Sequence, residues 1–540
     1  MVFKLQFRNR HRVKNIARCI VALSALLLCL PTPLSASDNI ALQHIQAAQG
    51  FFSSGQYFKA ARYAFAAQEE SQDLEADAYS WITVSLVRAG LYQSASYFFI
   101  RTLQSGNKTA IKRVLTETEK LLLSVGADIL RKYLIRHTEY DDYDAKNRSA
   151  YLFSIGKEAV LSGKEREALG YLGGIARGSF LWPKALQLRG TGYAILGDVN
   201  NAIRDFKECE DRADELIKLG VGDPLKVRLL KREAADLKAR CSAGEARTLY
   251  QMDRFDEADV KYDGIPKSSF VWPDILFEQA WNSFGRREYN RSLGKLVSYK
   301  SPALSFVFNS EVDVLRAQAY LALCLYHDAD GVIDEFNKKY TDLSRQLKLL
   351  VEKGGDNMGM FYDFGKQALM APVYTANGMH RMANRFVRGP YFQDLVASEH
   401  TSATELAAVN RLEKMHASEK IGVSGGGFPS FLEQVLSWRV KSVRLLGGAF
   451  VKNSLMDYHA VLVSDFDKIS FIKYEILKRA KESLIYKNSS SVLDRDRGAL
   501  APVRRGYQFF WSFNGEFWND ELGDYVFGLE SACGAENAGA

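Results

Sequence analysis

A short sequence motif recurs along much of the chain at intervals of 34 or 35 residues. A turn of the type Gly-x-Tyr is followed within a few positions by a small residue, usually alanine. Gly55 and Gly90 lie 35 residues apart, and Gly163 and Gly197 lie 34 apart. A fixed period of this length predicts helix–turn–helix units that stack, because one helix pair is too small to bury its apolar face alone.

Seven such units are clear between residues 40 and 340, and residues 103–148 are expected to hold one degenerate unit. Small residues let the two helices of a unit approach closely, and large apolar residues fill the space beside them. Position 253 is Asp and position 287 is Arg, where the pattern predicts a turn glycine. The small residues occupy positions 60, 95, 168, 202, 258, 292 and 329.

The phrase SFLWP at 179–183 returns as SFVWP at 269–273. Proline is tolerated in the first turn of a helix, so each phrase predicts the start of a first helix. Proline also favours extended geometry in the preceding Trp182 or Trp272, which would end the previous helix. The 90-residue spacing exceeds two repeats by 22 residues, which predicts a lengthened helix pair near 203–250.

The unit resembles the tetratricopeptide repeat (TPR) superfamily over residues 40–340, with Leu186, Gly190 and Tyr193 placed before Gly197. The resemblance implies an all-α solenoid whose first helices line a concave, protein-binding side. The whole layout, including the ending FWSFNGEFWNDELG, loosely resembles large exported TPR proteins of gliding and predatory proteobacteria. That second resemblance implies an association with motility machinery.

Residues 1–36 have the character of a secretory signal peptide. Six basic residues precede the twelve-residue apolar run CIVALSALLLCL, and small residues follow it. Twelve residues are short for a membrane span, although an uncleaved anchor is the alternative. The leader carries six of the seven net positive charges, so the mature chain is nearly neutral and nucleic-acid binding is not expected. We therefore expect the periplasm, or the periplasmic face of the outer membrane, of a Gram-negative bacterium.

Long helices are expected at 341–487, followed by a loop and an aromatic-rich tail at 488–540. The helices would pack on the end of the array and cap it, and no further membrane span is expected. Nine of the 21 residues from 507 to 527 are aromatic. The tail is either a patch for a partner or a membrane interface, or a segment folded back on the helices, which we favour.

No motif for catalysis, a cofactor or a metal occurs in the sequence context that it requires. The G-x-S-x-G match at Ser424 lacks the strand that a nucleophile elbow needs. The histidines are scattered, and no Walker loop, H-E-x-x-H or C-x-x-C occurs. Cys209 and Cys241 would pair in an oxidising compartment, but two unpaired helix residues are the favoured interpretation.

Binding to a partner protein remains as the expected function. Phe277, Trp281 and Phe284 share one stripe of the helix that starts at Pro273, and Trp81 holds the corresponding place in an earlier unit. They would line a groove for a peptide or helix of a partner, or else pack between units, which is the favoured alternative.

The sequence thus predicts a non-catalytic scaffold of the bacterial envelope that associates with an envelope complex. One alternative is a periplasmic adaptor for outer-membrane or cell-wall assembly. The other is an enzyme with its site in the C-terminal region, near Ser424 or between His400 and His459.

Overall fold

The computed structural model describes residues 36–218, 224–371, 377–416, 427–483 and 515–533. Over these residues the chain forms 21 α-helices, three 3-10 helices and no strand. The prediction of an all-α fold is confirmed. The signal peptide interpretation falls on residues 1–36, of which 1–35 lie outside the described residues.

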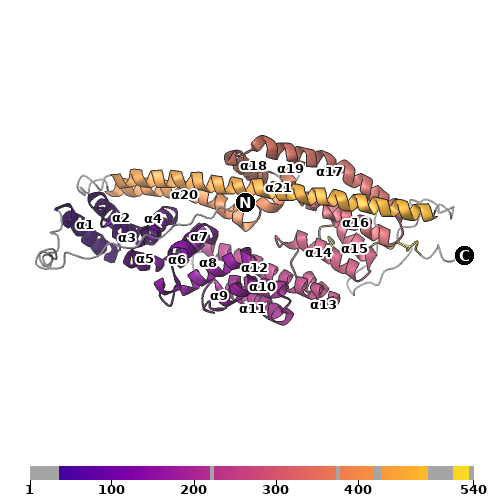
Figure 1. Cartoon of the computed structure of the whole chain (residues 1–540), viewed down its shortest axis with the longest axis horizontal. Coiled ribbons are helices and arrows are strands. Elements are labelled where there is room, and N and C mark those ends of the chain that lie inside the picture. The colour runs from indigo at the N-terminus through magenta and orange to yellow at the C-terminus, as the bar shows by residue number, and fades with distance from the viewer. Residues whose placement is uncertain (1–35, 219–223, 372–376, 417–426, 484–514, 534–540) are drawn as a thin grey trace, which may run out of the picture.

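Seven helix pairs build the repeat array, and successive pairs lie side by side (Figure 1). First helices also contact the next first helix, as α1 contacts α3 and α10 contacts α12. The array is therefore a TPR-like solenoid. The pairs are α1 (Ala36–Ser53) with α2 (Tyr57–Glu70), α3 (Glu75–Arg88) with α4 (Tyr92–Gln104), α8 (Arg148–Leu161) with α9 (Glu165–Gly173), α10 (Trp182–Ile195) with α11 (Val199–Lys218), α12 (Pro224–Gln251) with α13 (Phe255–Asp263), α14 (Trp272–Gly285) with α15 (Tyr289–Val297), and α16 (Glu311–Ala322) with α17 (Tyr326–Gly354).

The degenerate unit consists of three short helices in place of a pair. They are α5 (Lys108–Leu115), α6 (Thr118–Val125) and α7 (Ala127–His137), and the 3-10 helix η1 (Tyr140–Asp142) follows them. Further along, α11 has 20 residues and α12 has 28, so these two neighbouring helices of successive units are longer than any helix before them.

Every one of the seven turns passes through one residue in the left-handed backbone region. Glycine holds this position in four turns, where it is free of the Cβ clash that disfavours the conformation. Three turns use other residues, with φ of 57° at Asp253, 62° at Arg287 and 58° at Cys324. The next amide then donates to a carbonyl near the end of the first helix, as Lys164 N does to Ala159 O at 2.9 Å. The two missing glycines are therefore substitutions within an unchanged turn.

The repeated WP phrases begin helices, but with tryptophan already inside the helix. Trp182 is the first residue of α10 and Trp272 the first of α14. The expected extended tryptophan is wrong, because the Trp182 amide donates to Ser179 O at 3.0 Å in a turn that continues into the helix. Both indoles are buried, at 3% and 6% exposure, and their burial outweighs the local preference of a residue before proline.

The C-terminal region consists of α18 (Met358–Met370), α19 (Gly378–Val387), α20 (Pro390–His416) and α21 (Phe428–Ser483). Helix α21 has 56 residues and is about 84 Å long. It runs along most of the length of the molecule and lies beside both ends of the repeat array (Figure 1). We call α21 the brace.

The N-terminal end of the brace packs on the first repeat units. Phe428 lies 5.1 Å from the ring of Phe65, and Phe431 lies 5.8 Å from the ring of Phe98. The region therefore packs on the last repeat unit, at the end of the array, and also reaches the first units. The physical reason is that α2 and α4 present aromatic residues on their outer face, and the hairpin of α20 and the brace covers them.

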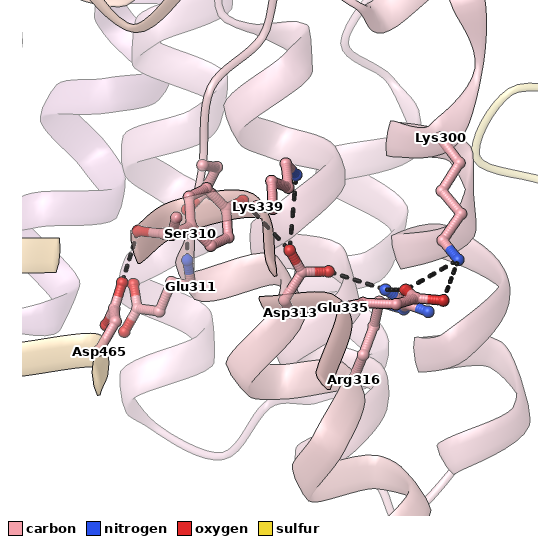
Figure 2. A network of polar contacts seen from close by, with 10 residues as sticks. Lys300, Ser310, Glu311, Asp313, Arg316, Glu335, Lys339 and Asp465 are labelled. Carbon is pink, nitrogen blue, oxygen red and sulfur yellow. Dashed lines mark hydrogen bonds and ion pairs between the residues drawn. The ribbon is translucent and has the colours of Figure 1, made fainter. Parts of the chain in front are cut away.

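The C-terminal half of the brace is attached to the last repeat unit by polar contacts (Figure 2). Ser310, before α16, donates to the fully buried carboxylate of Asp465 at 2.6 Å. Lys468 contacts Glu311 at 2.9 Å. The brace therefore joins the first and last units of the array.

A second ionic cluster connects the two helices of that last unit to Lys300, which follows α15 (Figure 2). Asp313 accepts from Arg316 at 2.7 Å and contacts Lys339 at 3.5 Å. Glu335 lies between Arg316 and Lys300, at 3.2 and 3.1 Å. Although burial acts to raise it, Lys339 and Arg316 hold the pKa of Asp313 below its ordinary value.

The tail folds back on the array over residues 515–533, which confirms the favoured interpretation for that stretch; residues 507–514 lie outside the described residues. Asn290 of α15 donates to Leu529 O and accepts from Leu529 N, both at 3.0 Å. A Cβ on Gly294 would lie 1.8 Å from Tyr525 O, so only glycine permits this approach.

Two disulfides cross-link the helices. Cys209 of α11 is bonded to Cys241 of α12, so the favoured interpretation of unpaired residues is wrong. The lengthened helices lie side by side and bring the two Cα atoms to 6.2 Å. Cys324, at the last turn, is bonded to Cys533 of the tail across 209 residues of sequence.

Candidate interaction site

A cavity of about 800 Å³ opens where the lengthened helices stand beside the tail. Its walls are α11, α12, the loop 264–271, the 3-10 helix η3 (Pro302–Leu304) and residues 519–522 of the tail. A second 3-10 helix, η2 (Ser298–Lys300), links η3 to α15. We call this space the edge cavity.

The second WP phrase forms the apolar floor of the edge cavity. Trp272 packs in one cluster with Leu304 and Leu522, each 5 or 6% exposed. Phe270, two residues earlier, is 40% exposed and lines the same cavity. The loop places them this way because Ser269 N donates to Pro266 O at 2.9 Å, which reverses the chain before α14 begins.

Charged residues stand around this floor, and cations outnumber acids. Lys238 contacts Asp214 of α11 at 2.7 Å, and Lys267 contacts Asp524 of the tail at 3.0 Å. The Arg388 guanidinium lies 5.5 Å from the ring centre of Phe306. The lining contains Arg232, Lys238, Lys267 and Arg388 against Asp214 and Asp236.

This arrangement is suited to binding. An apolar floor with exposed aromatics and a cationic rim fits an apolar side chain next to a carboxylate, as found in a peptide segment. The lining includes neither histidine nor cysteine, so it offers no nucleophile–base pair of the usual kind. Among the described residues no group of three or more His, Cys, Asp or Glu side chains is arranged to hold a metal ion.

The structure brings together three of the four aromatic residues that the sequence singled out. In α14, Trp281 lies 6.4 Å from Phe277 and 5.6 Å from Phe284. All three are half-buried and pack on Val312 and Leu315 of the next unit. Their contacts are those of packing between units, and their exposed parts are not the floor of the edge cavity.

Trp81 lies apart from the other three, in the first units. It packs on Phe52 of α1 at 5.6 Å, and the Arg113 guanidinium lies 4.5 Å above its ring. It contributes to the core clusters of the first units, so the four residues do not form one groove.

The sequence did not point to the edge cavity as a site. Trp272 and Phe270 stood out as a repeated phrase, which was a usable signal for a special loop. Arg388 and the tail residues come from distant parts of the chain, and no local pattern joins them to that loop.

The enzyme alternative has little structural basis in the described residues. Ser424 lies outside them. Glu399, the neighbour of His400, contacts Arg444 of the brace at 3.1 Å. Arg444 precedes His459 by fifteen residues, or about 22 Å along the helix. His400 and His459 therefore do not face one pocket.

No protein-family model and no curated protein matches the chain. Among solved structures, the crystal structure of yeast Tom70 aligns with 82% of this chain and 97% of that one, at 12% sequence identity and a TM-score of 0.19. An alignment at that TM-score carries no argument. The helix pairs and their common turn are what make the array TPR-like.

Proposed function

We propose that the protein is a non-catalytic scaffold that holds a partner protein in place through the edge cavity. The observation that carries the proposal is the combination of an apolar floor and a cationic rim in a cavity of about 800 Å³. The brace supports the proposal, because an array attached to one long helix at both ends keeps its curvature and presents its surfaces in a fixed arrangement.

We propose further that the chain is exported to an oxidising compartment, the periplasm or the periplasmic face of the outer membrane. The two disulfides support this location, since disulfides persist outside the reducing cytosol. The basic and apolar character of residues 1–36 supports it independently. None of the described helices is both long enough and apolar enough to cross a membrane.

A photo-crosslinking amino acid at Phe270 tests the scaffold role in cells that make the protein. The expected result is a covalent adduct with one partner that disappears when Arg388→Glu reverses the charge at the rim. The matched control places the crosslinker at Val260, which is 72% exposed on α13 and outside the cavity. Equal adducts from both positions would contradict a role for the edge cavity.

The identity of the captured partner separates the finer proposals. Motility components would support the association implied by the resemblance to exported TPR proteins of gliding bacteria. Barrel-assembly or peptidoglycan-synthesis proteins would support the adaptor alternative. Export itself is tested by sequencing the mature N-terminus after fractionation, and an intact leader on a cytoplasmic protein would contradict it.

A further inference from the structure

The outward face of the brace carries a line of large apolar side chains. Their exposed fractions run from 44% to 62%, which is high for residues of this size. They recur at steps of seven and eleven residues, so they stay on one line of a helix with 3.6 residues per turn. This outer stripe consists of Leu445, Met456, Val463 and Tyr474; Trp438 lies on the same line but packs on Tyr97 of α4, with ring centres 5.8 Å apart.

The inward face of the same helix is already used. Val443, Val451, Leu455 and Leu462 are completely buried against the rest of the molecule and lie about 100° or more around the helix axis from the outer stripe. The outer stripe is therefore not needed to pack the brace on the rest of the chain. Contiguous exposed apolar surface of this kind marks an interaction site.

Small residues alternate with the large ones along the outer stripe. Ser442, Ala449 and Ala460 stand between the large side chains at three- and four-residue steps. This alternation lets a second helix approach, because the large residues of each helix fit beside the small residues of the other. The surface is thus built for a long straight helix.

We propose that the occupant is the brace of a second copy of this chain, antiparallel to the first, with a two-fold axis between His459 and Ala460. In this register Met456 faces the second copy's Val463, and Leu445 faces its Tyr474. The interface is isologous, since each contact occurs twice.

Charge complementarity selects this register and orientation. Lys452 and Asp467 are the charged residues nearest the middle of the outer stripe, and they lie at equal distances from the axis. The antiparallel arrangement places each Lys452 opposite an Asp467, whereas a parallel one would place like charges together. Asp467 is exposed, and Lys452 contacts the exposed carboxylate of Asp356 at 3.0 Å within one copy.

The size of the surface sets the strength of the association. From Leu445 to Tyr474, the part that faces the second copy's stripe in this register, the stripe is about 44 Å long, and a helix contact is about 10 Å wide. The interface would bury roughly 900 Å² in total, in the size range of weak, transient protein pairs. The dimer is therefore reversible, with a dissociation constant in roughly the micromolar range.

Sedimentation velocity of the purified protein with both disulfides intact tests the proposal. The wild type shows a concentration-dependent monomer–dimer equilibrium. Val463→Glu abolishes it, while Val461→Glu, at a 50% exposed residue off the stripe, leaves it unchanged. Circular dichroism and the melting temperature confirm that both variants are folded.

A charge exchange tests the register. Asp467→Lys and Lys452→Asp each weaken the dimer at least tenfold, and the double variant returns within about threefold of the wild type. Asp356→Asn removes the ion pair that Lys452 makes within one copy, and this variant should leave the dimer unchanged. Ala460→Cys forms an intermolecular disulfide near the axis, and Asn453→Cys does not.

Four results would overturn the proposal. The first is a monomer at every concentration up to about 100 μM, well above the expected dissociation constant. The second is a dimer that is indifferent to the charge exchange. The third is binding of the stripe to anionic vesicles by a protein that remains monomeric. The fourth is slow hydrogen exchange over residues 445–474 in a monomeric protein, if Val463→Glu accelerates that exchange. This result would show that another segment of the same chain covers the stripe.

Discussion

Glu405 of α20 connects the C-terminal hairpin to the second repeat unit, and its substitution tests whether this contact stabilises the fold. The carboxylate accepts hydrogen bonds from Gln93 N at 2.7 Å, Ser94 N at 2.9 Å and Ser94 Oγ at 3.0 Å. These donors begin α4, whose first amides have no partner within the helix. A carboxylate there also meets the positive end of the helix dipole.

The expected cost of Glu405→Gln follows from these three contacts. The amide keeps one acceptor oxygen, and its NH₂ group faces the two donors of Ser94. Arg439, which donates to Gln93 Oε1 at 2.9 Å, also loses the negative charge beside it. Loss of two charge-assisted hydrogen bonds at a buried site costs about 3 kcal/mol, or roughly 100-fold in the local opening equilibrium.

Hydrogen exchange measured by mass spectrometry on the peptide that contains Gln93 and Ser94 gives the readout. Both residues are buried, so their amides exchange slowly while the contact is intact. Glu413→Gln is the matched control, at an exposed position of the same helix for which the structure describes no polar contact. Equal exchange of this peptide in the two variants would refute the reasoning.

Four further predictions concern stability. Arg287→Gly and Asp253→Gly relieve the left-handed conformation and raise the unfolding free energy by about 1 kcal/mol each, whereas Gly197→Ala lowers it by about as much, as thermal unfolding will show. Because the pKa of Asp313 is lowered in the folded state, its stabilising contribution is complete above pH 3.8, the ordinary pKa of the group, and is lost as the pH falls through the lowered pKa. Asp313→Asn costs about 3 kcal/mol of unfolding free energy at neutral pH and flattens this acid dependence in unfolding titrations. Gly294→Ala displaces the tail, which limited proteolysis detects as new cleavage in residues 515–533 with the repeat array intact; unchanged cleavage would contradict the observed packing. Replacement of Cys209 and Cys241 by serine removes a cross-link across 32 residues and lowers the unfolding free energy by about 4 kcal/mol, and an unchanged melting temperature would argue against the bond.

The repeat units could be predicted from the sequence because their cause is local. The turn residues Gly55, Gly90, Gly163 and Gly197 and the small residues that follow them fix where each chain reversal occurs. Even the exceptions at Asp253 and Arg287 kept the turn, because the packing of two helices over many residues outweighs about 1–2 kcal/mol of backbone strain.

The brace, the disulfides and the edge cavity could not be predicted in the same way. Glu405 meets Gln93 across 312 positions, and Cys324 meets Cys533 across 209. Such contacts depend on how far the array curves, which is the sum of small rotations between units. Trp281 illustrates the same limit: its spacing placed it on a stripe of one helix, but only the position of α16 decides that the stripe packs between units.

The most direct test of the account is photo-crosslinking from the N-terminal end and from the C-terminal half of the brace. A benzophenone amino acid at Phe431 should form an adduct within the same chain with residues 57–104, because this ring contacts Phe65 and Phe98. The same group at Phe466 should react with α17, whose Phe336 lies 5.0 Å away. Adducts from both positions in one folded protein are the predicted result, and adducts at position 431 that reach only α20 would contradict a brace between the first and last repeat units.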